Sequence, residues 1–332
     1  MSKMSIDPTR HALHGPTMGT RWTALFHAGL GFDPHPVRAA LQAVVDEVDA
    51  QMSTWKPDSD LMRLNASPVG PWQAVPARLL EVLVLSRNIG HASGGAFDMG
   101  MGDAVTAWGF GADAADPTQI RAAMGSYPVK AALEIDVTGG RVCKTAPITL
   151  DLNGIAKGYG VDRLADTLRD LGIPAGLVGI DGEMRAMGLR PDGAPWTIAI
   201  EAPDPERRAP HSVLALQDAA VATSGDYRHW VEVQGRRLSH TMDPSRRAPL
   251  LAPPASVTVI AQTCAEADAW ATALMVLGMD AGAKLAEQRG LDALFLVRDG
   301  RTGVHGTAVG RLFSKQLSPT DLGLDRERSK PS

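Results

Sequence analysis

The sequence is poor in cysteine, and it contains neither a long apolar run nor an excess of basic charge. Its two cysteines among 332 residues, Cys143 and Cys264, form no CxxC pair, which argues against a disulfide framework and against a zinc site built on cysteine. No stretch is apolar over enough residues to cross a bilayer. A formal net charge of -4 argues against a nucleic-acid binder that relies on a broadly basic surface.

The remaining composition is that of a soluble globular protein, with 44% hydrophobic and 21% charged residues. The first residues lack the apolar region of a signal peptide, so we expect a cytoplasmic protein as the chain stands, or a periplasmic one if an export signal was removed. We also expect a flexible segment over residues 1–14, one domain with two lobes over 15–312 and a polar tail over 313–332.

Hydrophobic spacing predicts helices in four places. They begin at Pro36, after Pro76, near Val161 and at Cys264, and a loop is expected over residues 52–65. Strands are expected on both sides of a hairpin turn at 139–140, and also over 19–28, 176–180, 196–201, 213–216, 230–233, 256–261 and 293–297. Because the strands come in hairpin-like groups between helices, we predict an α+β fold with a largely antiparallel sheet.

The segment from Leu150 to Asp162 joins a β-like stretch to an amphipathic helix through a glycine-spaced turn. Lys157 could offset the charge of a pyrophosphate there, while amides at the start of the helix bind an anion. Alternatively, Asp151 ends a strand and caps the helix, and Lys157 is merely solvated. The turn matches neither GxGxxG nor the P-loop pattern, so both interpretations stay open.

Asp268 and Thr272 lie four residues apart on a predicted helix, which places a carboxylate and a hydroxyl on one face. Both are hard oxygen donors, which suit magnesium better than zinc. The alternative is a solvent-facing Asp and a Thr hydroxyl bonded back to its own helix. Spacing alone favours that alternative.

Three further segments contain candidate functional residues. His240 follows a predicted hairpin turned at 234–235, where it could act as a general base near neutral pH, although most of the nine histidines must be ordinary. Trp55 could stack on a planar ring or simply pack. Residues 223–227 form either a ligand-facing loop or a plain turn, and the six glycines of 93–111 indicate tight turns or close backbone approach.

Taken in order, these segments resemble the ApbE family of FAD:protein FMN transferases over roughly residues 15–300. The resemblance rests on Met18-Gly19-Thr20, Met52-Ser53-Thr54-Trp55, Ser93-Gly94-Gly95-Ala96-Phe97-Asp98, Trp108-Gly109-Phe110-Gly111, Asp151-Leu152-Asn153-Gly154-Ile155-Ala156-Lys157-Gly158-Tyr159, Thr223-Ser224-Gly225-Asp226-Tyr227, His240-x-x-Asp243-Pro244 and Ala267-Asp268-Ala269-x-Ala271-Thr272-Ala273-Leu274. It implies a T-fold-like architecture with two lobes around a central FAD cleft.

The resemblance also implies a set of site residues. Magnesium would be held by the Gly154 carbonyl, Asp268 and Thr272. The positions that match FAD contacts in the family are Met18, Trp55, Ala96, Phe97, Asp98, Asp151, Lys157 and Met242. His240, as the base, is predicted to be catalytic, together with Asp243 and Lys157.

The implied reaction is attack by a threonine hydroxyl of an acceptor flavoprotein on the FMN-side phosphorus of FAD, with AMP as the leaving group. Magnesium would neutralise charge on the pyrophosphate. Two alternatives are FAD hydrolysis to FMN and AMP, and FAD binding without turnover. No nucleic-acid partner and no membrane span are expected.

The chain departs from the family pattern in several places. Where the family commonly continues Asp-Pro with x-Thr-Gly-x-Pro, the chain has Ser245-Arg246-Arg247-Ala248-Pro249. The two arginines could alter the contact with the acceptor or with phosphate. Trp55 replaces the usual Tyr, Met99-Gly100 follows Asp98 in place of Pro-Thr, and the Gly-Gly before an acidic residue is Asp181-Gly182-Glu183.

Overall fold

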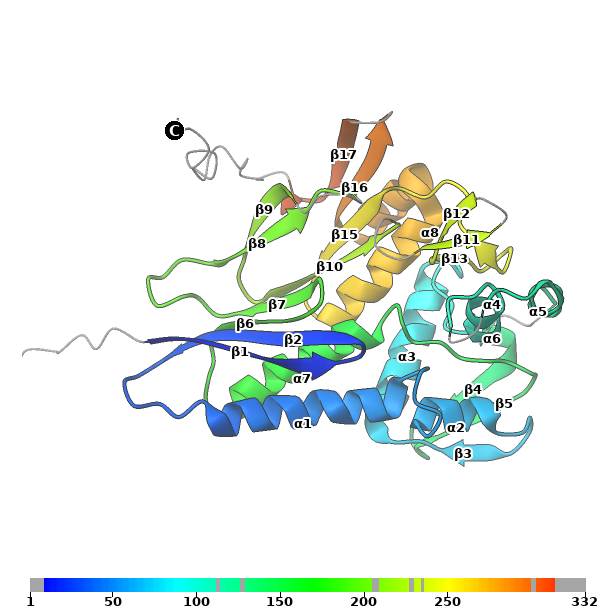
Figure 1. Cartoon of the computed structure of the whole chain (residues 1–332), viewed down its shortest axis with the longest axis horizontal. Coiled ribbons are helices and arrows are strands. Elements are labelled where there is room, and N and C mark those ends of the chain that lie inside the picture. The colour runs from blue at the N-terminus through cyan, green and yellow to red at the C-terminus, as the bar shows by residue number, and fades with distance from the viewer. Residues whose placement is uncertain are drawn as a thin grey trace, which may run out of the picture.

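The main sheet has eight strands, and each neighbouring pair is antiparallel (Figure 1). This computed structural model describes residues 9–111, 114–125, 129–204, 209–226, 230–233, 236–299 and 303–313. In spatial order the strands are β1 (Thr9–Thr17), β2 (Thr20–Ala28), β6 (Gly176–Ile180), β7 (Glu183–Met187), β10 (Ala219–Gly225), β15 (Ser256–Ala261), β16 (Asp292–Asp299) and β17 (Gly303–Val309). The predicted α+β class with an antiparallel sheet is confirmed.

Helices pack on one face of this sheet. The helix α1 (His35–Met52) contacts β1 and α7 (Ala156–Asp170), and α7 in turn contacts α8 (Cys264–Arg289). The alternating Trp22, Ala24 and Phe26 of β2 are fully buried in the core cluster that α1 and α7 share. The predicted half-buried strand at 19–28 is therefore confirmed. The buried face of this strand packs against α7.

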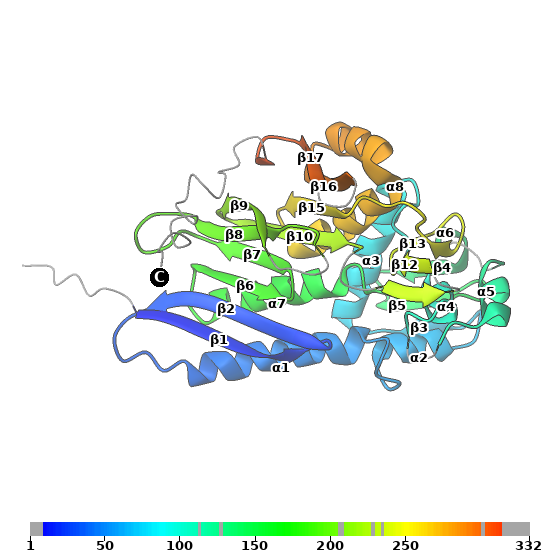
Figure 2. The same ribbon diagram turned by 45° about the horizontal axis from the view of Figure 1, so that its top comes forward.

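The opposite face is covered by the hairpin of β8 (Trp196–Glu201) and β9 (Pro210–Leu216) (Figure 2). Its apolar residues pack against Leu177, Val221, Ile260 and Leu294 of the main sheet. Strands with both faces covered in this way have near-continuous apolar sequences, as in β6.

A second group of elements gathers at one end of the molecule, at the right of Figure 1. It contains a three-stranded sheet, in the order β3 (Trp72–Ala74), β5 (Arg141–Lys144) and β4 (Leu133–Asp136), which includes the predicted hairpin. Its helices are α2 (Asp60–Ala66), α3 (Ala77–Ala92), α4 (Gly102–Ala107), α5 (Pro117–Ala123) and α6 (Val129–Ala132). Short hairpins pair β11 (Trp230–Val233) with β12 (Arg236–Ser239), and β13 (Met242–Asp243) with β14 (Ala248–Pro249).

Several element predictions need correction or extension. The predicted loop over 52–65 contains α2, which Ser59 caps by accepting a hydrogen bond from the Met62 amide. Residues 223–225 belong to β10 rather than to a loop or a turn, and Tyr227 lies outside the described residues. The helix predicted over 264–277 continues to Arg289 through a non-helical Gly278.

The ends of the chain are described only in part. The strand β1 begins at Thr9, inside the segment predicted to be flexible, and the tail from residue 314 lies outside the described residues. Within the described part of the chain, no helix combines the length and the apolar character that a membrane span requires.

Candidate functional site

The start of α7 meets α8 at Gly154. A Cβ on this glycine would come within 3.0 Å of Thr272 Oγ1 and 3.3 Å of the Phe97 ring, so three predicted site residues from separate segments converge here. The Thr272 hydroxyl shares a hydrogen bond with Ser224 Oγ of β10, 3.2 Å away. That contact leads away from α8, which contradicts the alternative of a Thr hydroxyl bonded back to its own helix.

Asp268 is buried, with 6% of its surface exposed, so the solvent-facing alternative is also wrong. Its Oδ2 accepts a hydrogen bond of 3.1 Å from the Gly158 amide of α7. The two helices touch because residue 158 has no side chain: a Cβ there would lie 2.3 Å from Cys264 O and 2.8 Å from Asp268 Cβ. Close packing at this glycine thus places the Asp268 carboxylate beside the start of α7.

The charges around Asp268 are mostly negative. Burial and the Glu183 carboxylate raise the pKa of Asp268 to about 8, although the Gly158 amide and the Lys157 ammonium act in the opposite direction. Glu183 is 8% exposed, and its Oε2 has no hydrogen-bond partner among the described residues. Burial likewise raises the pKa of Glu183. A buried excess of carboxylate is unfavourable on its own and fits a bound cation.

Lys157 lies within the same charged group, and its Nζ is 3.2 Å from Asp181 Oδ2. Burial lowers the pKa of Lys157, but Glu183, Asp181 and Asp268 outweigh that effect and raise the pKa. The ammonium therefore keeps its charge. Asp181 and Glu183 flank the β6–β7 turn, and the sequence assigned them no site role, because only the sheet brings that turn to α7.

Asp151 forms a local turn and does not cap α7. Its carboxylate accepts hydrogen bonds from the Asn153 amide and from Asn153 Nδ2, at 2.8 and 3.0 Å, while α7 has no side-chain cap. No strand precedes it, so the predicted β-like stretch at Leu150 is wrong. The Asp151 amide donates to Met99 O at 2.7 Å, and burial raises the pKa of the carboxyl group.

The residues predicted to contact FAD occupy distinct local settings. Ala96 and Phe97 are buried, and Asp98 Oδ1 accepts a hydrogen bond from the Gly100 amide at 2.7 Å. Met18 lies in the two-residue β1–β2 turn with a φ of 45°, and its methyl group would be 3.3 Å from a Cβ on Gly160 of α7. The β1–β2 hairpin thus places Met18 against the first turns of α7.

Trp55 lies in the turn that follows α1, and it is 64% exposed. Ser53 Oγ accepts a hydrogen bond from the Trp55 amide at 3.1 Å, which fixes the backbone and leaves the ring outside the core. The alternative that this tryptophan simply packs is therefore wrong, and a stacking role stays a prediction.

His240 directly follows β12, at the strand end where the sequence placed it, and it is half-buried. Met242 of β13 is buried in a small cluster with Met101, Ala104 and Ala107. Asp243 Oδ1 accepts hydrogen bonds from the amide and the hydroxyl of Ser245, at 2.9 and 2.6 Å. Its carboxylate thus shapes the turn between β13 and β14, and the catalytic roles assigned to His240 and Asp243 stay predictions.

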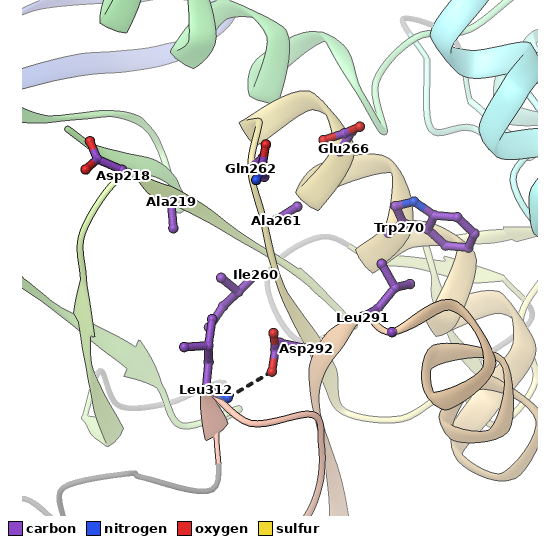
Figure 3. Close-up of a pocket in the computed structure, with 11 residues that line it drawn as sticks. Asp218, Ala219, Ile260, Ala261, Gln262, Glu266, Trp270, Leu291, Asp292 and Leu312 are labelled. Atoms are coloured by element: carbon purple, nitrogen blue, oxygen red, sulfur yellow. Dashed lines mark hydrogen bonds between the residues drawn. The ribbon is translucent and has the colours of Figure 1, made fainter. Parts of the chain in front are cut away.

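A hollow of about 410 Å³ lies elsewhere among the described residues (Figure 3). None of the predicted site residues lines it. Its three carboxylates have structural partners: Asp218 accepts from the Gly188 amide, Asp292 from the Leu312 amide, and Glu266 from the Thr263 hydroxyl. We therefore place the candidate site at the contact of α7 with α8.

Comparison with known proteins finds relatives over most of the chain. The sequence profile of the ApbE family matches residues 18–295, which include the predicted magnesium ligands and the contacts described above. A FAD:protein FMN transferase of Klebsiella pneumoniae (strain 342) is 35% identical, over 88% of this chain and 85% of the relative. One of Vibrio cholerae is 36% identical, over 86% of this chain and 87% of the relative.

Solved structures show the same architecture. The apo flavinyl transferase ApbE of Pseudomonas stutzeri superposes with a TM-score of 0.82 and 38% identity, covering 93% of this chain and 96% of the other. The flavin transferase ApbE of Vibrio cholerae gives a TM-score of 0.82 and 33% identity, covering 92% and 99%. Each superposition therefore covers more than nine-tenths of this chain.

Proposed function

The chain belongs to the ApbE family, and from this premise we propose that it is an enzyme that transfers FMN from FAD to an acceptor protein. The structural observation that carries the proposal is the convergence of Gly154, Asp268 and Thr272 beside the charged Lys157. Oxygen ligands for a hard cation and a fixed ammonium suit a pyrophosphate substrate. We place FAD between the main sheet and the second group of elements, within a single domain over residues 15–312.

We propose a threonine hydroxyl as the acceptor group. Its oxygen attacks the FMN-side phosphorus, a new phosphoester bond forms, and the bond from that phosphorus to the bridging oxygen breaks. AMP leaves with the bonding electron pair, and His240 takes the proton of the threonine. Most of the rate enhancement would come from alignment, which supplies on the order of 7–11 kcal/mol of the barrier in ideal cases.

Several of the remaining site residues would hold FAD. The Lys157 ammonium, held by Asp181, would pair with a phosphate oxygen. Met18, Phe97 and the exposed Trp55 ring offer apolar or aromatic surface to the flavin or the adenine. Asp98 and Asp151 offer carboxylates to polar groups of the ligand. Asp243 would act through the turn that it shapes.

The Gly154 carbonyl, Asp268 and Thr272 would hold a magnesium ion. All three are hard oxygen donors, and a cation would offset the burial and the Glu183 carboxylate that raise the pKa of Asp268 to about 8. When bound, the ion would neutralise charge on the pyrophosphate and stabilise the departing phosphate.

The test is an incubation with FAD, magnesium and a peptide that contains one threonine. We expect the peptide to gain the mass of one FMN phosphoester and an equal amount of AMP to appear. A peptide with alanine at that position, and the His240→Ala enzyme, serve as controls. Free FMN and AMP formed without peptide would instead indicate FAD hydrolysis. Bound FAD with no AMP from any acceptor would indicate a binding protein and overturn the proposal.

A further inference from the structure

The turn between β13 and β14 contains a residue in an unusual backbone conformation. Arg247 has a φ of 49°, in the left-handed region that an L-residue with a side chain rarely occupies. The ApbE pattern has glycine at this position, which adopts that conformation without steric cost. Arginine keeps the backbone shape of the family turn and adds a long cationic side chain, so the surrounding contacts must hold a strained residue in place.

Three of those contacts lead to one segment, residues 100–108, which contains α4. The guanidinium is 6% exposed, and its Nη2 donates to Gly100 O at 2.9 Å and pairs with the Asp103 carboxylate. The Arg247 carbonyl accepts a hydrogen bond of 3.0 Å from Trp108 Nε1. The side chain and the backbone of Arg247 thus both bind residues 100–108. The guanidinium is directed into the protein, whereas the neighbouring Arg246 is exposed.

Residues 98–102 are in turn joined to the candidate FAD site. The Gly100 amide donates to Asp98 Oδ1, and Met99 O accepts from the Asp151 amide, both at 2.7 Å. A Cβ on Gly102 would lie 2.9 Å from Thr149 O, so α4 begins directly against the segment that precedes Asp151. A contact that holds Gly100 in place therefore also helps to hold Asp98 and Asp151, two of the residues predicted to contact FAD.

At its other end Arg247 is fixed to the hairpin that follows His240. The Arg247 amide donates to Asp243 O at 2.7 Å, and the Leu250 amide donates to Thr241 O at 3.0 Å. Met242, between them, is buried against Met101 and Ala104. Arg247 is thus a direct polar link between the segment that carries His240 and the segment that carries Asp98.

We propose that Arg247 is a positioning residue, which holds the His240–Met242 segment at a fixed place relative to Asp98 and Asp151. Its consequence for turnover rests on the function proposed above. Both bonds come from one nitrogen, Nη2, at the end of the arginine side chain, and a lysine ammonium on its shorter stem reproduces them only in part. Because the Arg247 side chain is buried and Arg246 is exposed, only Arg246 of the two is placed to meet an acceptor or a phosphate.

The test compares Arg247→Gly, Arg247→Met and Arg247→Lys in the full chain, at a temperature at which each variant is fully folded. Arg247→Gly removes the strain as well as the ion pair. We expect kcat/KM to fall on the order of 10–100-fold in the Gly and Met variants, with a rise in KM for FAD, and to recover in part in the Lys variant. Faster amide exchange over residues 241–250 should accompany the loss. Folded variants with wild-type kcat, KM and exchange would overturn the proposal.

Two further variants sharpen the result. Arg141 of β5 also pairs with an aspartate, Asp136, at 2.8 Å, but lies outside the site, so Arg141→Met should leave kcat and KM unchanged. Asp103→Asn should reproduce much of the Arg247→Met effect, and the double variant should be no worse than Arg247→Met alone. If the losses of activity in Arg247→Met and Asp103→Asn add up in the double variant, the two residues act independently and the proposal is overturned. If the wild type transfers no FMN, the proposed function fails, and amide exchange still decides whether Arg247 holds the hairpin.

Discussion

Two glycines at the start of α7 have different neighbours, and the difference decides what each one does. A Cβ on Gly158 would meet the Cys264 carbonyl at 2.3 Å, which is main chain and cannot move alone. A Cβ on Gly154 would meet the Thr272 hydroxyl at 3.0 Å, which can rotate away. Gly158 therefore sets how closely the helices pack, whereas Gly154 sets how closely its own backbone approaches a proposed metal ligand.

We predict that Gly154→Ala weakens magnesium binding more than folding. The new methyl group would displace the Thr272 hydroxyl by a few tenths of an ångström. We expect magnesium affinity to fall about tenfold, which corresponds to about 1.4 kcal/mol. We expect the free energy of unfolding to fall by about 1 kcal/mol. Calorimetric titration with magnesium in the presence of FAD, together with urea unfolding, measures both. Gly158→Ala is the matched comparison and should cost about 3 kcal/mol of stability. Unchanged magnesium affinity in Gly154→Ala would contradict the assignment.

At the residue scale the sequence predicted the type of site but not its electrostatics. The four-residue spacing placed Asp268 and Thr272 on one helix face, yet spacing contains no information about burial, and on spacing alone the solvent-exposed interpretation was favoured. The partners that decide the matter are Gly158 and Glu183, which are 110 and 85 residues away from Asp268 in sequence. Contacts of such range depend on tertiary packing and are not visible in a local pattern.

Among the elements, α8 depends on a carboxylate from another helix. Asp162 of α7 accepts hydrogen bonds from the amides of Cys264 and Ala265, at 2.8 and 2.9 Å, and pairs with Arg185 Nη1 at 2.6 Å. Four residues beyond Cys264 the same helix presents Asp268. Asp162 thus accepts hydrogen bonds from two free amides at the start of α8. It also fixes the position of α8 along the axis of α7.

We predict that Asp162→Ala lowers the free energy of unfolding by about 3–5 kcal/mol, because it leaves a largely buried Arg185 without its partner. Urea unfolding followed by circular dichroism measures the loss. Asp162→Asn keeps an acceptor oxygen without the charge and should fall between the wild type and the alanine variant. A loss below about 1 kcal/mol for Asp162→Ala would show that the Thr263 cap alone is sufficient to begin α8.

Elements with a sustained apolar period were predictable, and short or irregular ones were not. The long stripes of α1 and α7 and the alternation in β2 each bury one face, so their pattern reflects their packing. By contrast, α2 has seven residues inside a polar stretch and is held by the Ser59 cap. The stretch before Asp151 is apolar but pairs with no strand, because the Thr149 carbonyl accepts from the Gly102 amide of α4 and the Leu150 amide donates to Asn65 Oδ1. Apolar character alone could not distinguish it from a strand.

On the scale of the whole molecule, the site is assembled from segments that no local rule brings together. Phe97, Gly154 and residues 268–272 converge because α7 and α8 pack against each other on one antiparallel sheet (Figure 1). The ordered motifs of the ApbE resemblance predicted this convergence, whereas composition and periodicity could not. Tyr159 links the main sheet's helices to the second group of elements. Its hydroxyl, on α7, donates a hydrogen bond to the Glu81 carboxylate of α3.

Burial, together with the hydrogen bond to Glu81, raises the pKa of Tyr159 well above its usual value of 10. Below pH 10 both folded and unfolded chains keep this proton, so its contribution is intact; above pH 10 only the unfolded tyrosine ionises. We predict that stability then falls by up to about 1.4 kcal/mol per pH unit from this group. The stability advantage of wild type over Tyr159→Phe should therefore shrink between pH 9 and 11.5, as measured by urea unfolding. A constant difference would mean that Tyr159 titrates normally and that its bond to α3 contributes little.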